Sequence, residues 1–128
     1  MCIRDSDLTQ FLFAADRGNP RLAERYDWLS PAILRFLSRV AIACNTAGVP
    51  VGVCGEMGGR PLEAMALLGL GIDRLSITPA AVGPVKAMIR SLDLGALRAA
   101  MPAWLAEGPR DLRGRMEAWA GAQDTAIL

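Results

Sequence analysis

The sequence predicts part of a parallel α/β fold followed by a helical tail. Residues 49–54 form a short valine-rich apolar run between glycines, which is the pattern of a fully buried strand. A glycine-rich loop and a helix that starts at Pro61 come next, and residues 74–78 alternate like a second strand. Strands that alternate with helices are typical of parallel sheets.

Two helices are predicted before the first strand. Residues 1–6 show no periodicity, and we expect them to be a truncated or artefactual start, with an ordinary frayed terminus as the alternative. Asp7 stands at the N-cap position of a short helix, which ends in the polar loop 16–20. Its apolar face consists of Leu8, Phe11, Leu12 and Ala15. Ser30 then caps a longer helix that ends near Gly48.

The remaining elements give the pattern of an incomplete barrel. A strongly apolar helix covers 62–70, Pro79 ends the strand 74–78, and a helix follows at 84–91. Two strands joined by helices cannot bury both faces of a sheet, so some apolar side chains should lack partners. These are Val51, Val53, Leu67, Leu68 and Leu70.

From Leu94 onward the spacing of the apolar residues predicts helices only. We therefore divide the chain into the end of a barrel at 7–93 and a helical tail at 94–128. Trp104 and Trp119 lie in the tail, and we interpret both as packing anchors rather than ligand platforms.

Composition limits the possible classes of function. The formal net charge of +1 over 128 residues predicts no nucleic-acid partner and no anionic-membrane partner. Apolar stretches of about 18 residues, as a membrane span needs, are absent. The three cysteines have no paired spacing, which favours free thiols in the cytoplasm. Histidine is absent, so a metal would need oxygen ligands, as Mg²⁺ does.

Cys54 is the first candidate for chemistry. It ends the predicted strand, and the carboxyl ends of parallel strands are where ligands bind in such folds. The alternative is an inert buried thiol, because cysteine is among the residues most often used for packing. Judged on local sequence alone, Asp7 is also explained as a helix cap and Arg17 as a solvated loop residue.

Six segments occur in an order and spacing that match a known family. They are DLTQ at 7–10, DRGN at 16–19, SPAILR at 30–35, VCGEMGG at 53–59, LLGLG at 67–71 and LSI at 75–77. Over about residues 7–120 the chain resembles the C-terminal end of Enzyme I of the bacterial phosphotransferase system, the phosphoenolpyruvate–protein phosphotransferase. The tail is most similar to the nitrogen-related branch. Related dikinases and synthases have Cys-Gly-Glu-His and Cys-Gly-Gln, whereas Glu56 and Met57 stand here.

The resemblance implies the C-terminal part of a (β/α)8 TIM-type barrel that binds phosphoenolpyruvate and Mg²⁺ at the carboxyl ends of its strands. Such an enzyme transfers the phosphoryl group to a protein histidine, then to a small phosphocarrier protein, and releases pyruvate. The full-length protein is expected to be a homodimer. The alternative is a non-catalytic phosphoenolpyruvate-binding or dimerisation module.

The resemblance also implies roles for three residues. Asp7 becomes a magnesium ligand, Arg17 the arginine that holds the phosphate, and Cys54 the acid that protonates the enolate carbon. Phosphoryl transfer depends on positioning and charge neutralisation, which a carboxylate-held Mg²⁺ and an arginine supply. A thiol can then deliver the proton that turns the enolate into pyruvate.

The sequence departs from the family just before Asp7. Arg4, Asp5 and Ser6 stand where the family has Gly-Thr-Asn. The strand that precedes this motif is expected to be missing, as are the second magnesium carboxylate, the other phosphate-binding arginines and the phosphorylated-histidine domain. We therefore expect the chain to be a fragment without phosphotransferase activity of its own.

Overall fold

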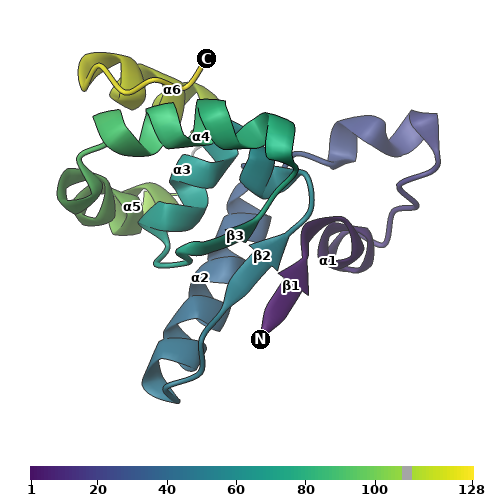
Figure 1. Ribbon diagram of the computed structural model, residues 1–128. Coiled ribbons are helices and arrows are strands. Elements are labelled where there is room, and N and C mark those ends of the chain that lie inside the picture. Colours follow the sequence, from purple (N-terminus) through teal and green to yellow (C-terminus); the bar gives the residue numbers. More distant parts are fainter. Residues whose placement is uncertain (108–110) are drawn as a thin grey trace.

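The computed structural model describes residues 1–107 and 111–128 as a three-stranded parallel sheet with helices packed around it (Figure 1). The elements are β1 (Cys2–Arg4), α1 (Asp5–Leu12), the 3₁₀ helix η1 (Pro20–Arg25), α2 (Pro31–Thr46), β2 (Gly52–Cys54), the 3₁₀ helix η2 (Met57–Gly59), α3 (Pro61–Gly69), β3 (Arg74–Ser76), α4 (Pro79–Ser91), α5 (Leu94–Glu107) and α6 (Leu112–Ala122). None of the described helices is long and apolar enough to cross a membrane.

The strands lie side by side in their chain order, with β2 in the centre. Arg4 of β1 pairs with Cys54 of β2, and Cys54 pairs with Ser76 of β3. All three carboxyl ends therefore meet at one edge of the sheet. The predicted unit of strand, glycine loop and helix is confirmed, although β2 is shorter than the apolar run 49–54 that predicted it.

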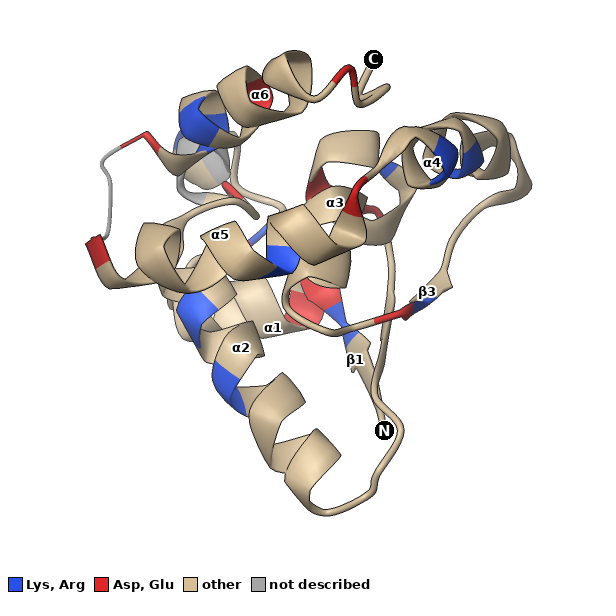
Figure 2. Cartoon of the chain, turned by 90° about the vertical axis from the view of Figure 1, so that its left-hand side faces the viewer, with Lys and Arg blue, Asp and Glu red and all other residues tan. Residues whose placement is uncertain are grey.

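The N-terminal segment corrects two predictions. The strand expected to be missing before Asp7 is present as β1, and the following helix starts at Asp5. Asp7 lies in the first turn of α1 and does not cap it, because the N-cap is Arg4. Figure 2 shows acidic residues where α1 starts, directly after β1. Strand β1 is held by pairing with β2, a non-local contact that periodicity within six residues cannot reveal.

Helix α2 follows its prediction closely. The Ser30 hydroxyl accepts a hydrogen bond from the backbone N–H of Ile33 at 3.4 Å, which satisfies one of the unpaired donors of the first turn. The helix ends just before Gly48, whose φ of +67° suits glycine. Its buried stripe consists of Ile33, Leu34, Leu37, Ala41 and Cys44.

Helix α3 is buried on every side. All residues from Leu62 to Leu68 are buried, which is typical of a helix that is apolar all round. The expectation that its leucines would lack partners is wrong, because α4 and α5 pack against it and complete its cover. Val51 and Val53 are buried as well, and Leu70 is half-buried.

Helix α4 begins at Pro79, earlier than the predicted start at Pro84. Proline fits the first turn of a helix because its missing N–H has no partner there. Pro84 lies inside α4, where it removes one backbone hydrogen bond without ending the helix.

The helical tail shares its core with the α/β part. Helix α5 approaches α3 closely at Gly69, where a Cβ atom would lie 2.9 Å from Cγ of Met101. Trp104 of α5 and Trp119 of α6 pack edge to face, with ring centroids 5.9 Å apart, which confirms their predicted role. The buried tail residues are Leu97, Met101, Trp104, Leu112, Met116 and Ala120.

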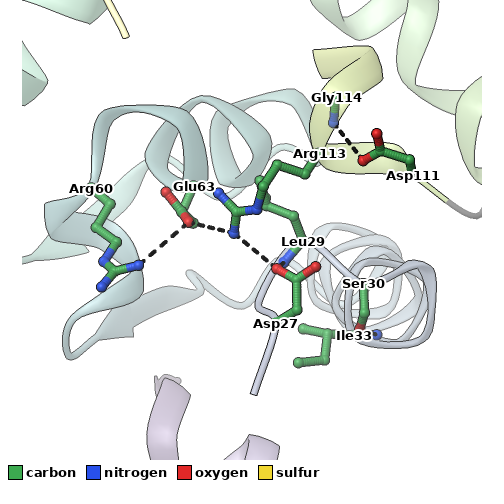
Figure 3. Close-up of polar contacts among 9 residues, drawn as sticks. All are labelled: Asp27, Leu29, Ser30, Ile33, Arg60, Glu63, Asp111, Arg113 and Gly114. Carbon is green, nitrogen blue, oxygen red and sulfur yellow. Dashed lines mark hydrogen bonds and ion pairs between the residues drawn. The ribbon is translucent and has the colours of Figure 1, made fainter. Parts of the chain in front are cut away.

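A polar cluster fastens α6 to the start of α3 (Figure 3). Nη2 of Arg113 donates to Oε1 of Glu63 at 2.9 Å and to Oδ1 of Asp27 at 2.8 Å. The Glu63 side chain is only 3% exposed, so the ion pair compensates a buried carboxylate. Burial alone would lower the pKa of Arg113, but the hydrogen bonds to Asp27 and Glu63 outweigh it and the pKa is raised.

Replacing Arg113 by Met should destabilise the chain by about 2–4 kcal/mol, because Glu63 would stay buried without its main partner. The estimate lies below the usual cost of breaking a buried pair, because Nη1 of Arg60 lies 3.9 Å from Oε1 of Glu63 and can partly compensate the charge of that carboxylate. Urea unfolding monitored by tryptophan fluorescence measures the loss, and adding Glu63→Gln should recover part of it.

The matched control is Arg115→Met on the same helix. Arg115 pairs with Glu107 at the surface, so its loss should cost no more than about 1 kcal/mol. Equal costs for the two arginines would contradict the role assigned to the buried pair.

Candidate functional site

Two adjoining cavities open at the carboxyl edge of the sheet. The first, of about 590 Å³, is lined by Arg4, Asp5, Ser6, Arg17, Tyr26, Trp28, Gly55, Glu56 and Arg60. The second, of about 520 Å³, is lined by Arg4, Cys54, Gly55, Glu56, Gly59, Arg60, Ser76, Ile77, Thr78 and Ala81. The residues that line both cavities are Arg4 at the end of β1 and Gly55, Glu56 and Arg60 between β2 and α3.

The glycine loop is fixed by Asp5, the first residue of α1. One carboxylate oxygen accepts from the backbone N–H of Ser6 and the other from that of Met57, each at 2.5 Å. Burial raises the pKa of Asp5, although both hydrogen bonds oppose the shift. Gly55 has a φ of +125°, and a Cβ atom there would lie 2.0 Å from Asp5 Oδ1. The turn after β2 therefore requires glycine on both counts.

Cys54 ends β2 and is half-buried beside the second cavity. Its pKa is raised, first by a hydrogen bond with the thiol of Cys2 and then by burial. The thiol therefore stays protonated at neutral pH. A protonated thiol at the end of a strand suits a proton donor better than a nucleophile, which would need the thiolate.

Arg17 lines the first cavity, and Asp7 lies next to Arg17 without lining the cavity itself. Nη1 of Arg17 donates to Oγ of Ser6 at 2.8 Å and lies 3.7 Å from Oδ1 of Asp7. Both side chains are about half exposed, so the ion pair is weak and both charges can turn toward a ligand. The loop that carries Arg17 is shaped locally, because the Asp16 carboxylate accepts from the N–H of Gly18 at 2.8 Å.

The three predicted site residues thus fall at one edge of the sheet, with Asp7 and Arg17 in contact and Cys54 at the adjoining cavity. Among the residues that the structure describes, no group of three His, Cys, Asp or Glu side chains converges as at a metal site. Asp7 can supply one carboxylate oxygen to a magnesium ion. Mg²⁺ held by one or two carboxylates commonly completes its shell with water and substrate phosphate.

Sequence reasoning missed part of this site. Asp5 lies in the segment interpreted as a non-native start, and only its contact with Met57, far along the chain, reveals its role. Glu56 and Arg60 follow Cys54 closely in the sequence and both line the two cavities, but no local pattern distinguishes them from solvated loop residues. Trp28 also lines the first cavity, and the signal for it in the sequence is an aromatic side chain directly after a polar connection.

Replacing Gly55 by Ala should destabilise the chain by about 2 kcal/mol or more, because the new Cβ atom meets the buried Asp5 carboxylate and the backbone is strained. Gly83→Ala makes the same change inside α4, where nothing lies within 4 Å of the new atom. That control should be neutral or stabilising by up to about 1 kcal/mol. Urea unfolding of both variants measures the difference, and similar effects of the same sign would refute this account of the loop.

Comparison with known proteins gives consistent results. Residues 1–94 match the family described as PEP-utilising enzyme, PEP-binding domain. A multiphosphoryl transfer protein of Escherichia coli is 42% identical over 96 residues, 75% of this chain and 12% of that protein. A Salmonella typhimurium protein named phosphoenolpyruvate-dependent phosphotransferase system is 43% identical over 88 residues, 69% of this chain and 12% of that protein.

A phosphoenolpyruvate-protein phosphotransferase of Bacillus is 42% identical over 90 residues, 70% of this chain and 16% of that protein. The chain therefore matches between 12% and 16% of the length of these relatives. The family match and the sequence identities agree with each other. They show that the chain belongs to the family of phosphoenolpyruvate-utilising enzymes, through their PEP-binding domain.

Proposed function

We propose that this chain forms the C-terminal part of a phosphoenolpyruvate–protein phosphotransferase of the bacterial phosphotransferase system. The observation that carries the proposal is the protonated Cys54 thiol at the end of β2, in a cavity that adjoins the one lined by Arg17. The named relatives with about 40% identity support it, since they are phosphotransferases or multiphosphoryl transfer proteins.

We infer that the three strands are consecutive strands of a (β/α)8 barrel. Their parallel pairing in chain order and the helices between them support this inference. Exposed apolar side chains support further contacts with the rest of such a barrel or with a second subunit, since Phe11 is 80% exposed and Ile42 63%. Homodimerisation of the full-length protein belongs to the same proposal.

The residues of the site divide the chemistry between them. Arg17 binds phosphate oxygens through its fork of N–H donors and stabilises their charge during transfer. Asp7 supplies one carboxylate oxygen to Mg²⁺, and the ion, when bound, neutralises phosphate charge. Ser6 holds the Arg17 guanidinium through the hydrogen bond at 2.8 Å.

Cys54 completes the reaction. The bond between phosphorus and the enol oxygen breaks as a histidine nitrogen on another domain takes the phosphoryl group. The electron pair left on the enolate then forms a C–H bond with the proton of the Cys54 thiol, which yields pyruvate. The resulting thiolate regains a proton from solvent, and its raised pKa favours that step at neutral pH.

Further features of the proposal come from the resemblance. A small phosphocarrier protein is the final acceptor, and the enzyme acts in the cytoplasm. We assign it to the nitrogen-related branch on the helical tail, which lies largely beyond the family match at residues 1–94.

The proposal is tested on the full-length protein that contains this segment. With phosphoenolpyruvate, Mg²⁺ and the phosphocarrier protein it should release pyruvate, and Cys54→Ala should reduce kcat at least about 100-fold, as loss of a general acid does. Cys44→Ala, at a buried position on α2, is the matched control and should retain activity. Release of pyruvate at the normal rate by Cys54→Ala would refute the role of this thiol, and a binding module would release none.

The protonation state of Cys54 has its own test. The rate of alkylation by iodoacetamide, followed for the Cys54 peptide by mass spectrometry, should rise with pH to a midpoint above the ordinary value of 9.0. In Cys2→Ser the midpoint should fall, because the contact with Cys2 is the largest cause of the raised pKa. A midpoint below 8 in the unmodified chain would argue for a thiolate and against a proton donor.

A further inference from the structure

Arg60 is a charged residue at both cavities to which the resemblance gives no role. It joins η2 to α3 and lines the cavity that holds Arg17 as well as the one that holds Cys54. Its side chain is 59% exposed, so it stands at the rim rather than in the core. Arg17 and Arg60 thus present two cations to one cavity from different segments of the chain.

Two contacts hold the Arg60 side chain without using its hydrogen-bond donors. The guanidinium carbon lies 5.1 Å from the centre of the Trp28 ring, within the range of a cation–π contact. Nη1 lies 3.9 Å from Oε1 of Glu63, which is too far for a hydrogen bond. Neither of these two contacts is a hydrogen bond of the guanidinium, so neither occupies the N–H groups with which it could bind a ligand.

Arg113 explains why Glu63 does not bind Arg60 directly. Figure 3 shows Glu63 between the two arginines, and the shorter contact, at 2.9 Å, is the one to Arg113. Asp27 accepts from the same Arg113 nitrogen and fixes it in place. Without Arg113, the buried Glu63 carboxylate would draw Arg60 into a close ion pair and away from the cavity.

We propose that Arg60 binds an anionic group of the substrate, beside Arg17, and that Arg113 of the tail is a positioning residue that keeps Arg60 available. The proposal rests on the proposed function, because the anion is phosphoenolpyruvate, which carries a phosphate and a carboxylate. Arginine recognises both groups through paired N–H donors. Residue 113 lies beyond the family match at 1–94, so a segment outside that match acts on the site.

The test uses the full-length protein and follows pyruvate release. Arg60→Gln should raise KM for phosphoenolpyruvate about 10- to 100-fold, as the loss of a hydrogen bond to a charged group does, with a much smaller change in kcat. Arg60→Lys keeps the charge and should recover part of the loss. Arg39→Gln removes the same charge from the exposed side of α2 and should leave KM unchanged.

The positioning role has a separate prediction. Arg113→Gln should raise KM in the same direction as Arg60→Gln, and adding Glu63→Gln should restore it, because the carboxylate that captures Arg60 is then gone. A merely structural role of Arg113 predicts a lower melting temperature without this rescue of KM. The same variants can be made in a Cys54→Ala protein and titrated calorimetrically with phosphoenolpyruvate and Mg²⁺. Their Kd values then give the comparison without turnover.

Several outcomes would overturn the proposal. An unchanged KM for phosphoenolpyruvate in a folded Arg60→Gln protein refutes substrate binding by Arg60 while the proposed function stands. A raised KM for the phosphocarrier protein alone would mean that Arg60 contacts the partner instead. A full-length wild-type protein that neither releases pyruvate nor binds phosphoenolpyruvate overturns the proposed function and this inference together.

Discussion

Helix α3 must be covered on every side, and the arrangement of the other elements follows from this constraint. Residues 62–68 are buried throughout, so no face of the helix is suited to water. The 3₁₀ helix η2, α4 and α5 pack against it, and α5 can come close enough because Gly69 has no side chain. The tail is therefore part of the core rather than an appendage, and burial of α3 is the force that holds it.

The same constraint explains the polar cluster behind the site. Glu63 is the one acidic residue within the buried part of α3, and its charge needs a cation that α3 itself does not supply. Arg113 reaches it from α6, and Asp27 binds the same nitrogen from the segment before α2. Three distant segments thereby meet at Glu63, four residues after Gly59 of the glycine loop. A requirement of the core thus shapes the charge distribution at the cavity rim.

Much of this architecture could be predicted from short-range patterns. The valine run, the glycines after it and Pro61 gave β2, its loop and α3, and Ser30 gave the start of α2. Cys54 was placed correctly at the end of a strand because that position depends on local sequence. Strand β1, the Asp5 carboxylate on the glycine loop and the two contacts of Arg60 depend on residues far apart in sequence. No periodicity encodes such pairings, so only the folded chain reveals them.

The close approach of α3 and α5 also constrains how related sequences can vary. A Cβ atom at position 69 would come within 3.2 Å of Leu97 as well as 2.9 Å of Met101, and both side chains are buried. A larger residue at 69 would therefore require smaller ones at 97 or 101 to keep the packing density of the interior. Positions 69, 97 and 101 are accordingly expected to change together in evolution, so that the α/β part and the tail are inherited as one unit.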